Sequence, residues 1–226
     1  MKTLHFLLVI AIAATGISCK RESKAAPAKI TEAETPKPIT PAAKKYIVDT
    51  IASSISWTGS KPTGKHMGTI SLSKGEIFAK NDTVETGTFT INMKSITVTD
   101  PKEGKDKINL ENHLKGLGDK ANEDHFFNIN KYPAGTFEIT GIIKQNNKTM
   151  VEGNLTLKGI TKNIAFPAFI SVNDTLAVIN SETFKINRVL WNINYNSKSA
   201  LENLGDHYIH DDIELKVSVT AKRNNK

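Results

Sequence analysis

The sequence of 226 residues contains one cysteine, no apolar run long enough to cross a membrane, and none of the short motifs that mark common catalytic sites. A single cysteine cannot form an internal disulfide or a thiolate metal cluster. The longest apolar run, at residues 4–14, is too short for a transmembrane helix, which needs about 20 residues. Gly-x-Ser-x-Gly, a glycine-rich phosphate loop and His-Glu-x-x-His are absent. The sequence therefore predicts no catalytic residue, no metal site and no cofactor.

The six histidines are the remaining candidates for metal binding. The densest cluster is His207-Tyr208-Ile209-His210-Asp211-Asp212, just before the last apolar segment. Two histidines three positions apart do not face the same side of a strand, so zinc binding here would require a loop that gathers them. A solvated loop is the favoured interpretation.

The net charge is +7, which raises the question of nucleic-acid binding. Seven of the 30 Lys and Arg residues precede residue 45, but only three of the 23 Asp and Glu residues do, so the rest of the chain is nearly balanced. No basic stripe with interleaved aromatic residues is present. We expect a solvated, mixed-charge surface and no nucleic-acid partner.

The N-terminus has the pattern of a secretion signal that ends at the lone cysteine. Lys2 is followed by the apolar residues 4–14 and then by Thr15-Gly16-Ile17-Ser18-Cys19. A small residue directly before a cysteine resembles a bacterial lipobox, although Gly16 stands where an aliphatic residue is usual. We predict a lipoprotein signal peptide at residues 1–18 and lipidation of Cys19, which would anchor the protein to a membrane of the bacterial cell envelope. An ordinary signal peptide is the alternative.

Residues 19–44 have the composition of a disordered membrane tether. They hold four of the eight prolines, no aromatic residue and no apolar periodicity. Such a segment buries too little apolar surface to offset the entropy lost on ordering the chain. The folded domain is accordingly expected at residues 45–226, held off the membrane by this spacer.

The stretch 151–164 shows what the folded domain is built from. Val151, Leu155 and Leu157 share one parity, and the residues of the other parity, at 152, 154, 156 and 158, are polar. Gly159 begins a short break, and a second strand follows from Asn163. The pattern predicts a β-hairpin with one dry face and one wet face.

The same alternation recurs along the chain with one interruption. Strands are predicted at residues 46–49, 55–59, 66–73, 75–79, 83–92, 136–143, 175–179, 183–195 and 213–221, with a β-bulge near Arg188. Residues 100–131 place Leu110, Leu114 and Leu117 at helical spacing and are expected to form a helical insertion over one barrel opening. Because large antiparallel sheets hide their edges, we predict an all-β fold, a closed antiparallel barrel of about eight strands; a two-sheet sandwich is the alternative.

Several motifs together resemble the YceI-like family of bacterial secreted proteins. They are Tyr46-Ile47-Val48-Asp49 with Ile55-Ser56-Trp57, His125-Phe126-Phe127 followed by residues 132–137 (YPAGTF), residues 153–162 (GNLTLKGITK), and Phe184-Lys185-Ile186-Asn187-Arg188. The resemblance spans about residues 45–222. It implies a lipocalin-like antiparallel barrel whose lumen holds a polyisoprenoid chain, such as the tail of a quinone, in a family with no agreed enzymatic activity.

An apolar lumen suits an isoprenoid, because that chain offers methyl groups and no hydrogen bonds. Arg188 shares the parity of Phe184 and Ile186, and a buried arginine needs a partner. It is therefore a candidate for holding a polar head group, unless the bulge turns it to solvent. The candidate ligand-binding residues are Trp57, Phe89, Ile91, Phe137, Ile139, Leu155, Phe166, Phe184, Arg188 and Trp191.

These features lead us to expect a membrane-anchored carrier or store for an isoprenoid lipid or quinone, with assembly into a homodimer left open. An enzyme acting on a lipid or a cell-wall component through His125, Arg188 and His207 is one alternative. A non-catalytic envelope module that binds another protein is a second. Three Asp-Thr-apolar triplets, at residues 49–51, 82–84 and 174–176, also match an acceptor pattern for O-glycosylation.

Overall fold

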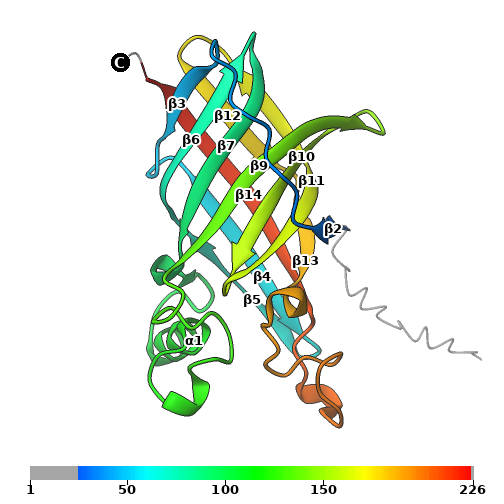
Figure 1. Cartoon of the computed structure of the whole chain (residues 1–226). Coiled ribbons are helices and arrows are strands. Elements are labelled where there is room, and N and C mark those ends of the chain that lie inside the picture. The colour runs from blue at the N-terminus through cyan, green and yellow to red at the C-terminus, as the bar shows by residue number, and fades with distance from the viewer. Residues whose placement is uncertain (1–24, 225–226) are drawn as a thin grey trace, which may run out of the picture.

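The protein is a long antiparallel β-barrel with two loop arms at one end (Figure 1). The computed structural model describes residues 25–224. Four pairs of segments, β3 with β4, β5 with β6, β7 with β8 and β12 with β13, run end to end, so twelve segments form eight strands. The segments are β3 (Lys44–Val48), β4 (Ser54–Lys61), β5 (Gly64–Ile70), β6 (Leu72–Lys80), β7 (Thr83–Asn92), β8 (Thr97–Val98), β9 (Ala134–Gln145), β10 (Lys148–Leu157), β11 (Ile160–Val172), β12 (Leu176–Ser181), β13 (Phe184–Asn187) and β14 (Asp212–Arg223).

The last strand closes the barrel. From the β3–β4 strand to the β12–β13 strand, each strand pairs with the one that follows it in the sequence. Strand β14 then pairs with β12 on one side and with β3 on the other. Its first half lies between β13 and β4, where Leu215 pairs with both Phe184 and Trp57. This closure leaves no open sheet edge along β14. The predicted eight-stranded antiparallel barrel is confirmed, and the sandwich alternative is wrong.

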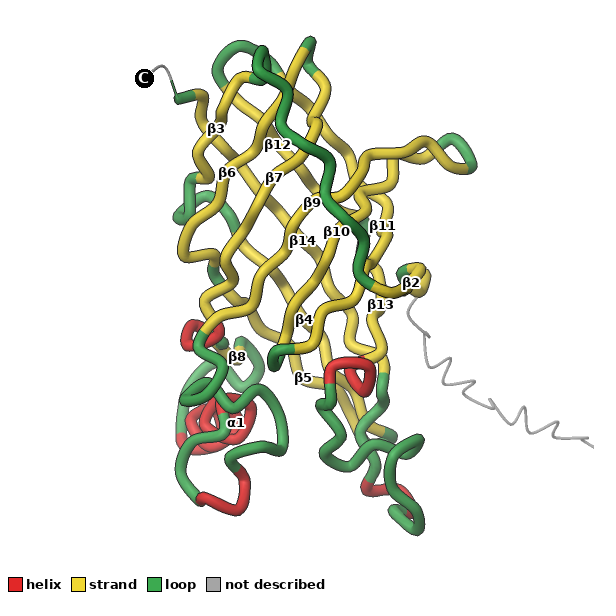
Figure 2. The backbone as a smooth tube through the Cα atoms, viewed as in Figure 1, coloured by secondary structure: helices red, strands yellow, loops and turns green. Residues whose placement is uncertain are grey.

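The two arms lie at the end where β4 turns into β5 (Figure 2). The α1 arm, residues 99–133, contains the 3₁₀ helix η2 (Lys120–Asn122) and the helix α1 (Lys105–Lys115), which ends at Gly116 with φ 73°. The η3 arm, residues 188–211, contains η3 (Arg188–Trp191) and η4 (Gly205–His207). The expected helical insertion is therefore present, and a further 3₁₀ turn, η1 (Met93–Ser95), joins β7 to β8. No helix in the described residues is long and apolar enough to cross a membrane.

The predicted strand at residues 183–195 is only partly correct. Regular pairing ends at Asn187, whose side chain accepts a hydrogen bond from the Val189 amide and so begins η3. The bulge that was expected near Arg188 is thus a helical turn.

A bulge lies instead in β9. There Gly153 pairs with Ile139 and Glu152 pairs with Gly141, so Thr140 is an extra residue. The bulge reverses the parity of β9 beyond this point: Gly141 faces Glu152 on the outside, whereas Ile142 packs against the core.

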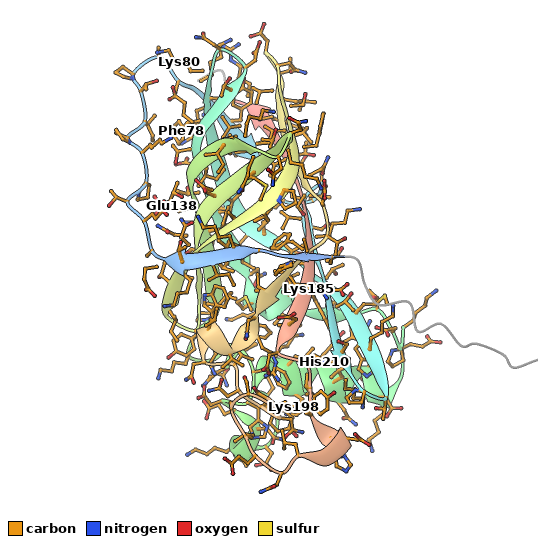
Figure 3. The ribbon with its side chains drawn as sticks, turned by 90° about the vertical axis from the view of Figure 1, so that its right-hand side faces the viewer. Phe78, Lys80, Glu138, Lys185, Lys198 and His210 are labelled. Atoms are coloured by element: carbon orange, nitrogen blue, oxygen red, sulfur yellow. The ribbon has the colours of Figure 1, made fainter. Side chains whose placement is uncertain are left out.

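The segment that was expected to be a disordered tether differs most from the prediction. Residues 26–32 form two short strands, β1 (Ala26–Pro27) and β2 (Lys29–Glu32). Strand β2 pairs antiparallel with β11 at residues 162–165, and β1 pairs in parallel with β13. Figure 3 shows this segment crossing the outside of the barrel between Glu138 and Lys185 and then running toward Lys80. We call residues 26–40 the strap. Cys19 lies outside the described residues.

The strap fills a slit in the barrel wall. The pairing of β11 with β12 begins at the pair Ala168 and Ser181 and continues away from the arms. On the arm side of that pair, β11 and β13 form hydrogen bonds with the strap instead of with each other. Inside the slit, the rings of Phe166 and Phe184 stack with centroids 4.3 Å apart. Main-chain pairing with two edges explains why a polar, proline-containing segment is ordered here without a core of its own.

The strap also covers polar residues on the outer face of the sheet. Asn154 donates from Nδ2 to the Glu34 carbonyl at 2.6 Å and accepts from the Glu34 amide at Oδ1 at 2.9 Å. Asn163 donates to Asn154 Oδ1 at 3.1 Å and to Thr140 Oγ1 at 2.9 Å. Asn154, Asn163 and Thr140 are therefore buried, although the alternation had placed Asn154 on the wet face.

Candidate functional site

The lumen holds one elongated apolar cavity that reaches from the middle of the barrel to the arms. Its volume is about 160 Å³, and its lining includes residues from the wall strands and from the α1 arm. Strand β14 alone contributes every second residue from Ile213 to Val219, a span of about 20 Å at roughly 3.3 Å per residue. Of the lining residues, all except Gly59, Arg188 and His210 have apolar side chains.

The end of the barrel far from the arms is packed solid. Tyr46, Ile77, Val84 and Ala177 are buried there and do not line the cavity. The hydroxyl of Tyr46 donates to the Asn173 carbonyl at 2.7 Å, which gives the buried phenol a partner. The cavity is therefore closed at one end, and a ligand would enter past the arms or through the wall.

Nine of the ten predicted ligand-binding residues line this cavity. Trp57, Phe89, Ile91, Phe137, Ile139, Leu155, Phe166, Phe184 and Arg188 are brought together around it. Trp191 is the exception: it is fully buried beside the lining, and its Nε1 donates to the Leu155 carbonyl at 3.1 Å. Contact between these residues and a ligand stays a prediction. Among the lining residues that the prediction omitted are Ile213, Leu215 and Val217, whose clean alternation was visible in the sequence.

Arg188 points inward, but its guanidinium is occupied by the protein. Nε, Nη1 and Nη2 donate to the carbonyl oxygens of His210, Ile193 and Ile209 at 3.2, 2.5 and 3.0 Å, and Nη2 lies 3.7 Å from Asp211 Oδ1. Burial lowers the pKa of Arg188, and the Asp211 carboxylate opposes that shift. The arginine thus joins the start of the η3 arm to its end, a structural role that the parity argument did not foresee.

A cluster of aromatic rings joins the two arms below the cavity. His113 of α1 and His125 approach through Nε2 and Nδ1 at 2.9 Å, and Tyr195 of the η3 arm stacks on His125 with ring centroids 4.1 Å apart. Phe126, which lines the cavity, packs edge-on against His113. Burial and the charge of His125 lower the pKa of His113, so the neutral ring is favoured.

Lys158 makes a second connection between the arms. It follows β10 at φ 45° and is 7% exposed, and its Nζ donates to the carbonyl oxygens of Asp124 and Asn192 at 3.0 and 3.1 Å. Its ion pair with Asp124 Oδ1 spans 2.9 Å and lowers the pKa of that carboxyl group. The strand pattern had placed this lysine on the wet face, and only the arms that fold over it explain its burial.

The histidines near the C-terminus do not form a cluster. His210 lines the cavity, and its ring packs edge-on against Tyr208, whereas His207 lies in η4. Across residues 25–224, no three His, Cys, Asp or Glu side chains are placed to hold a metal ion together. The enzyme alternative named His125, Arg188 and His207. Of these, His125 contacts His113, and Arg188 donates to backbone carbonyls, so the two side chains have different partners.

A sequence model of the YceI-like domain matches residues 46–221, which is most of the barrel. The chain belongs to the YceI-like family. The match begins at β3, so the strap lies outside it.

Individual YceI relatives are distant. The protein YceI of Salmonella arizonae is 29% identical over 87 residues, which are 36% of this chain and 43% of that protein. The same figures hold for YceI of Salmonella paratyphi B. This chain thus matches less than half the length of these curated relatives.

The barrel is similar in fold to two solved structures, among others. The crystal structure of BcnA from Burkholderia cenocepacia has a TM-score of 0.58 and 18% identity, and covers 77% of this chain and 99% of its own. A polyisoprenoid-binding domain from Saccharophagus degradans, implicated in plant cell wall breakdown, has a TM-score of 0.53 and 14% identity, with coverage of 79% and 98%. At these identities the likeness shows the fold.

Proposed function

We propose that this protein binds an isoprenoid lipid in its barrel lumen, for carriage or storage in the cell envelope. The observation that carries the proposal is the continuous cavity with an almost entirely apolar lining. Its elongated form suits a branched hydrocarbon chain, and each methylene removed from water contributes about 0.8 kcal/mol. The fold that the protein shares with a polyisoprenoid-binding domain supports the same ligand class.

The tail of the ligand would point toward the closed end of the barrel, and its head toward the arms. Toward the closed end the lining side chains are apolar, as at Phe89, Ile179 and Val219. The polar lining residues Arg188 and His210 lie at the arm end. This polarity suits a lipid with one apolar end and one polar end.

The proposal includes a membrane anchor at Cys19. If this cysteine is acylated, the first residue of β1 is seven positions further along the chain than the anchor. At no more than about 3.6 Å per residue, the slit side of the barrel would lie within about 25 Å of the anchored residue. Lipid exchange with the membrane would then occur over a short distance. Replacement Cys19→Ser tests the anchor, because the variant should move from the membrane fraction to the soluble envelope fraction and lose acyl mass. An unchanged distribution would refute it.

The ligand is tested by extracting purified protein with organic solvent and identifying the released lipid by mass spectrometry. An isoprenoid in stoichiometric amount is the expected result. Val217→Trp would fill the cavity, because Val217 lines it and is only partly buried. Lys216→Trp is the matched control, since its neighbouring side chain is exposed. The lipid should be lost from V217W and kept in K216W. Wild-type protein that is empty from several hosts, or equal lipid in both variants, would contradict the proposal.

A further inference from the structure

One part of the outer barrel wall carries a row of apolar side chains. Ile143, Met150 and Pro167 lie side by side on β9, β10 and β11, because Met150 pairs with both of the others. Val151, of the opposite parity on β10, lines the cavity, so the row faces outward. Phe169 lies two positions beyond Pro167 and faces the same way; it is 67% exposed, and Ile143 is 37% exposed. We call Ile143, Met150, Pro167 and Phe169 the β9–β11 patch.

The bulge at Thr140 is what places Ile143 in this patch. Without the extra residue, Ile143 would keep the parity of Ile139, which lines the cavity; with it, Ile142 packs against the core and Ile143 faces outward. Figure 1 shows the end of the β9–β10 hairpin projecting from the barrel on the side where β2 lies. Single exposed apolar residues are normal on protein surfaces, but a row that continues across three strands indicates a contact surface.

The chain that leads back to Cys19 leaves the barrel wall at the edge of the patch. Ala26, the first residue of β1, pairs with Phe184 of β13. Two positions before Phe184, the amide of Glu182 donates to the carbonyl of Pro167, a patch residue, at 2.9 Å. Cys19 is seven positions before Ala26, so an acyl anchor on it would lie within about 25 Å of this point. The anchor and the patch therefore belong to the same side of the molecule.

The lysines beside the patch already have partners within the protein. Lys148, two positions before Met150 on β10, forms an ion pair with Glu182 in which Nζ and Oε2 are 2.6 Å apart. The Nζ atom of Lys144 donates to Thr149 Oγ1 at 2.6 Å. The contact that the patch offers is thus mainly apolar, which suits the interfacial region of a bilayer, and it does not depend on anionic lipids.

We propose that the β9–β11 patch docks the barrel on the membrane surface, with Phe169 and Ile143 entering the interface between the lipid head groups and the acyl chains. The inference rests on the proposed anchor at Cys19 and adds an orientation to it. An anchor fixes only how far the barrel can move from the membrane, and it turns docking into an intramolecular step, so a small patch is sufficient. Docking would turn the strap toward the lipid, because the part of β11 that pairs with β2 ends at Ala165, two positions before the patch.

The test uses the acylated protein, reconstituted in phosphatidylcholine vesicles that contain nitroxide-labelled lipid. A fluorophore is attached at Gln145→Cys, in the exposed end of the hairpin, or at Ile51→Cys, which lies between β3 and β4, four strands away around the barrel from β10. Acylated Cys19 has no free thiol and stays unlabelled. The nitroxide lipid should quench the fluorophore at position 145 and not the one at position 51, and salt should leave this difference unchanged.

Phe169→Ser should lower the ratio of docked to undocked protein, measured by the fluorophore at position 145, about tenfold, which corresponds to ~1.4 kcal/mol. Ile51→Ser is the matched control, because Ile51 is 98% exposed and lies outside the patch. Both variants should keep the lipid that organic solvent extracts from the lumen.

Equal quenching at positions 145 and 51, or unchanged quenching at position 145 in F169S, would overturn docking by the patch while leaving lipid binding in the lumen intact. Cross-linking of position 145 to an envelope protein in cells, without quenching in vesicles, would overturn the membrane as the partner. A wild-type protein that carries no acyl mass would overturn the anchor, and this inference with it.

Discussion

Asn154→Ala should release the strap from the barrel. The Asn154 side chain makes two hydrogen bonds to the backbone of Glu34 and accepts a third from Asn163. Only the two bonds to Glu34 join Asn154 to the strap, so at about 1 kcal/mol of net stabilisation per hydrogen bond the docked strap loses roughly 2 kcal/mol. Apart from the main-chain pairing of β1 and β2, the other strap contacts are weak individually: Glu32 pairs with Lys162 at 2.7 Å in an exposed ion pair, and Thr40 donates from Oγ1 to Glu85 at 2.9 Å.

Hydrogen exchange measures this loss directly, because strap opening exposes the amides of β2 and of Ala28, which donates to the Lys185 carbonyl at 2.8 Å. Protection of residues 28–34 should fall about 30-fold in N154A, which is ~2 kcal/mol at 1.4 kcal/mol per tenfold, while protection in β9 and β14 stays high. Asn180→Ala is the control, since Asn180 bonds to Ser218 and not to the strap.

Opening of the slit should also speed the exchange of bound lipid with vesicles in N154A and leave it unchanged in N180A. A strap that is unprotected at residues 28–34 in the wild type, or an equal loss of protection in the two variants, would refute this docking role of Asn154.

Three further outcomes concern the arm end. Because the pKa of His113 is lowered below its ordinary 6.5, the folded state binds fewer protons than the unfolded state below about pH 6.5. The free energy of unfolding, measured by urea titration, should therefore be constant above about pH 6.5 and fall as the pH drops below it. His113→Asn should flatten that dependence. Lys158→Met should lower the free energy of unfolding by about 2 kcal/mol in the same titrations. In NMR titrations the pKa of Asp124 should return toward its ordinary value in this variant, and an Asp124 pKa that is the same in variant and wild type would contradict the ion pair. Arg188→Met leaves three carbonyl oxygens without donors and should cost about 3–5 kcal/mol, and a smaller loss than in the lysine variant would show that water replaces the guanidinium.

The barrel could be predicted because its information is local and repeated. Alternation along β10 and β14 predicts one apolar face, and the spacing of Leu110, Leu114 and Leu117 predicts the helical insertion. The bulge at Thr140 could not be predicted in this way, because it depends on the register with β10 and leaves no mark in the composition of β9. One extra residue there reverses which side chains face inward.

The strap could not be predicted for a different reason. Its own residues carry almost no apolar pattern, and only Ala28 and Ile30 pack against the core. Its order comes from pairing partners more than a hundred residues away, in β11 and β13. The sequence feature that could have indicated a covering segment is the pair of polar residues Asn154 and Asn163 in otherwise regular strands. From the sequence alone, however, such residues are interpreted as solvent-exposed.

Alternation also could not separate a packed core from a lumen, because inward residues look alike in both. Tyr46, Ile77 and Val84 share the strand pattern of the lining residues but fill the closed end of the barrel. Ile213 and Leu215 face the cavity and stay only partly buried. The difference arises from how many large side chains meet at one level of the barrel and from the arms, which extend the lumen at the end opposite the closed one. A lipid would therefore bind where the pattern continues but opposing side chains no longer fill the space between them.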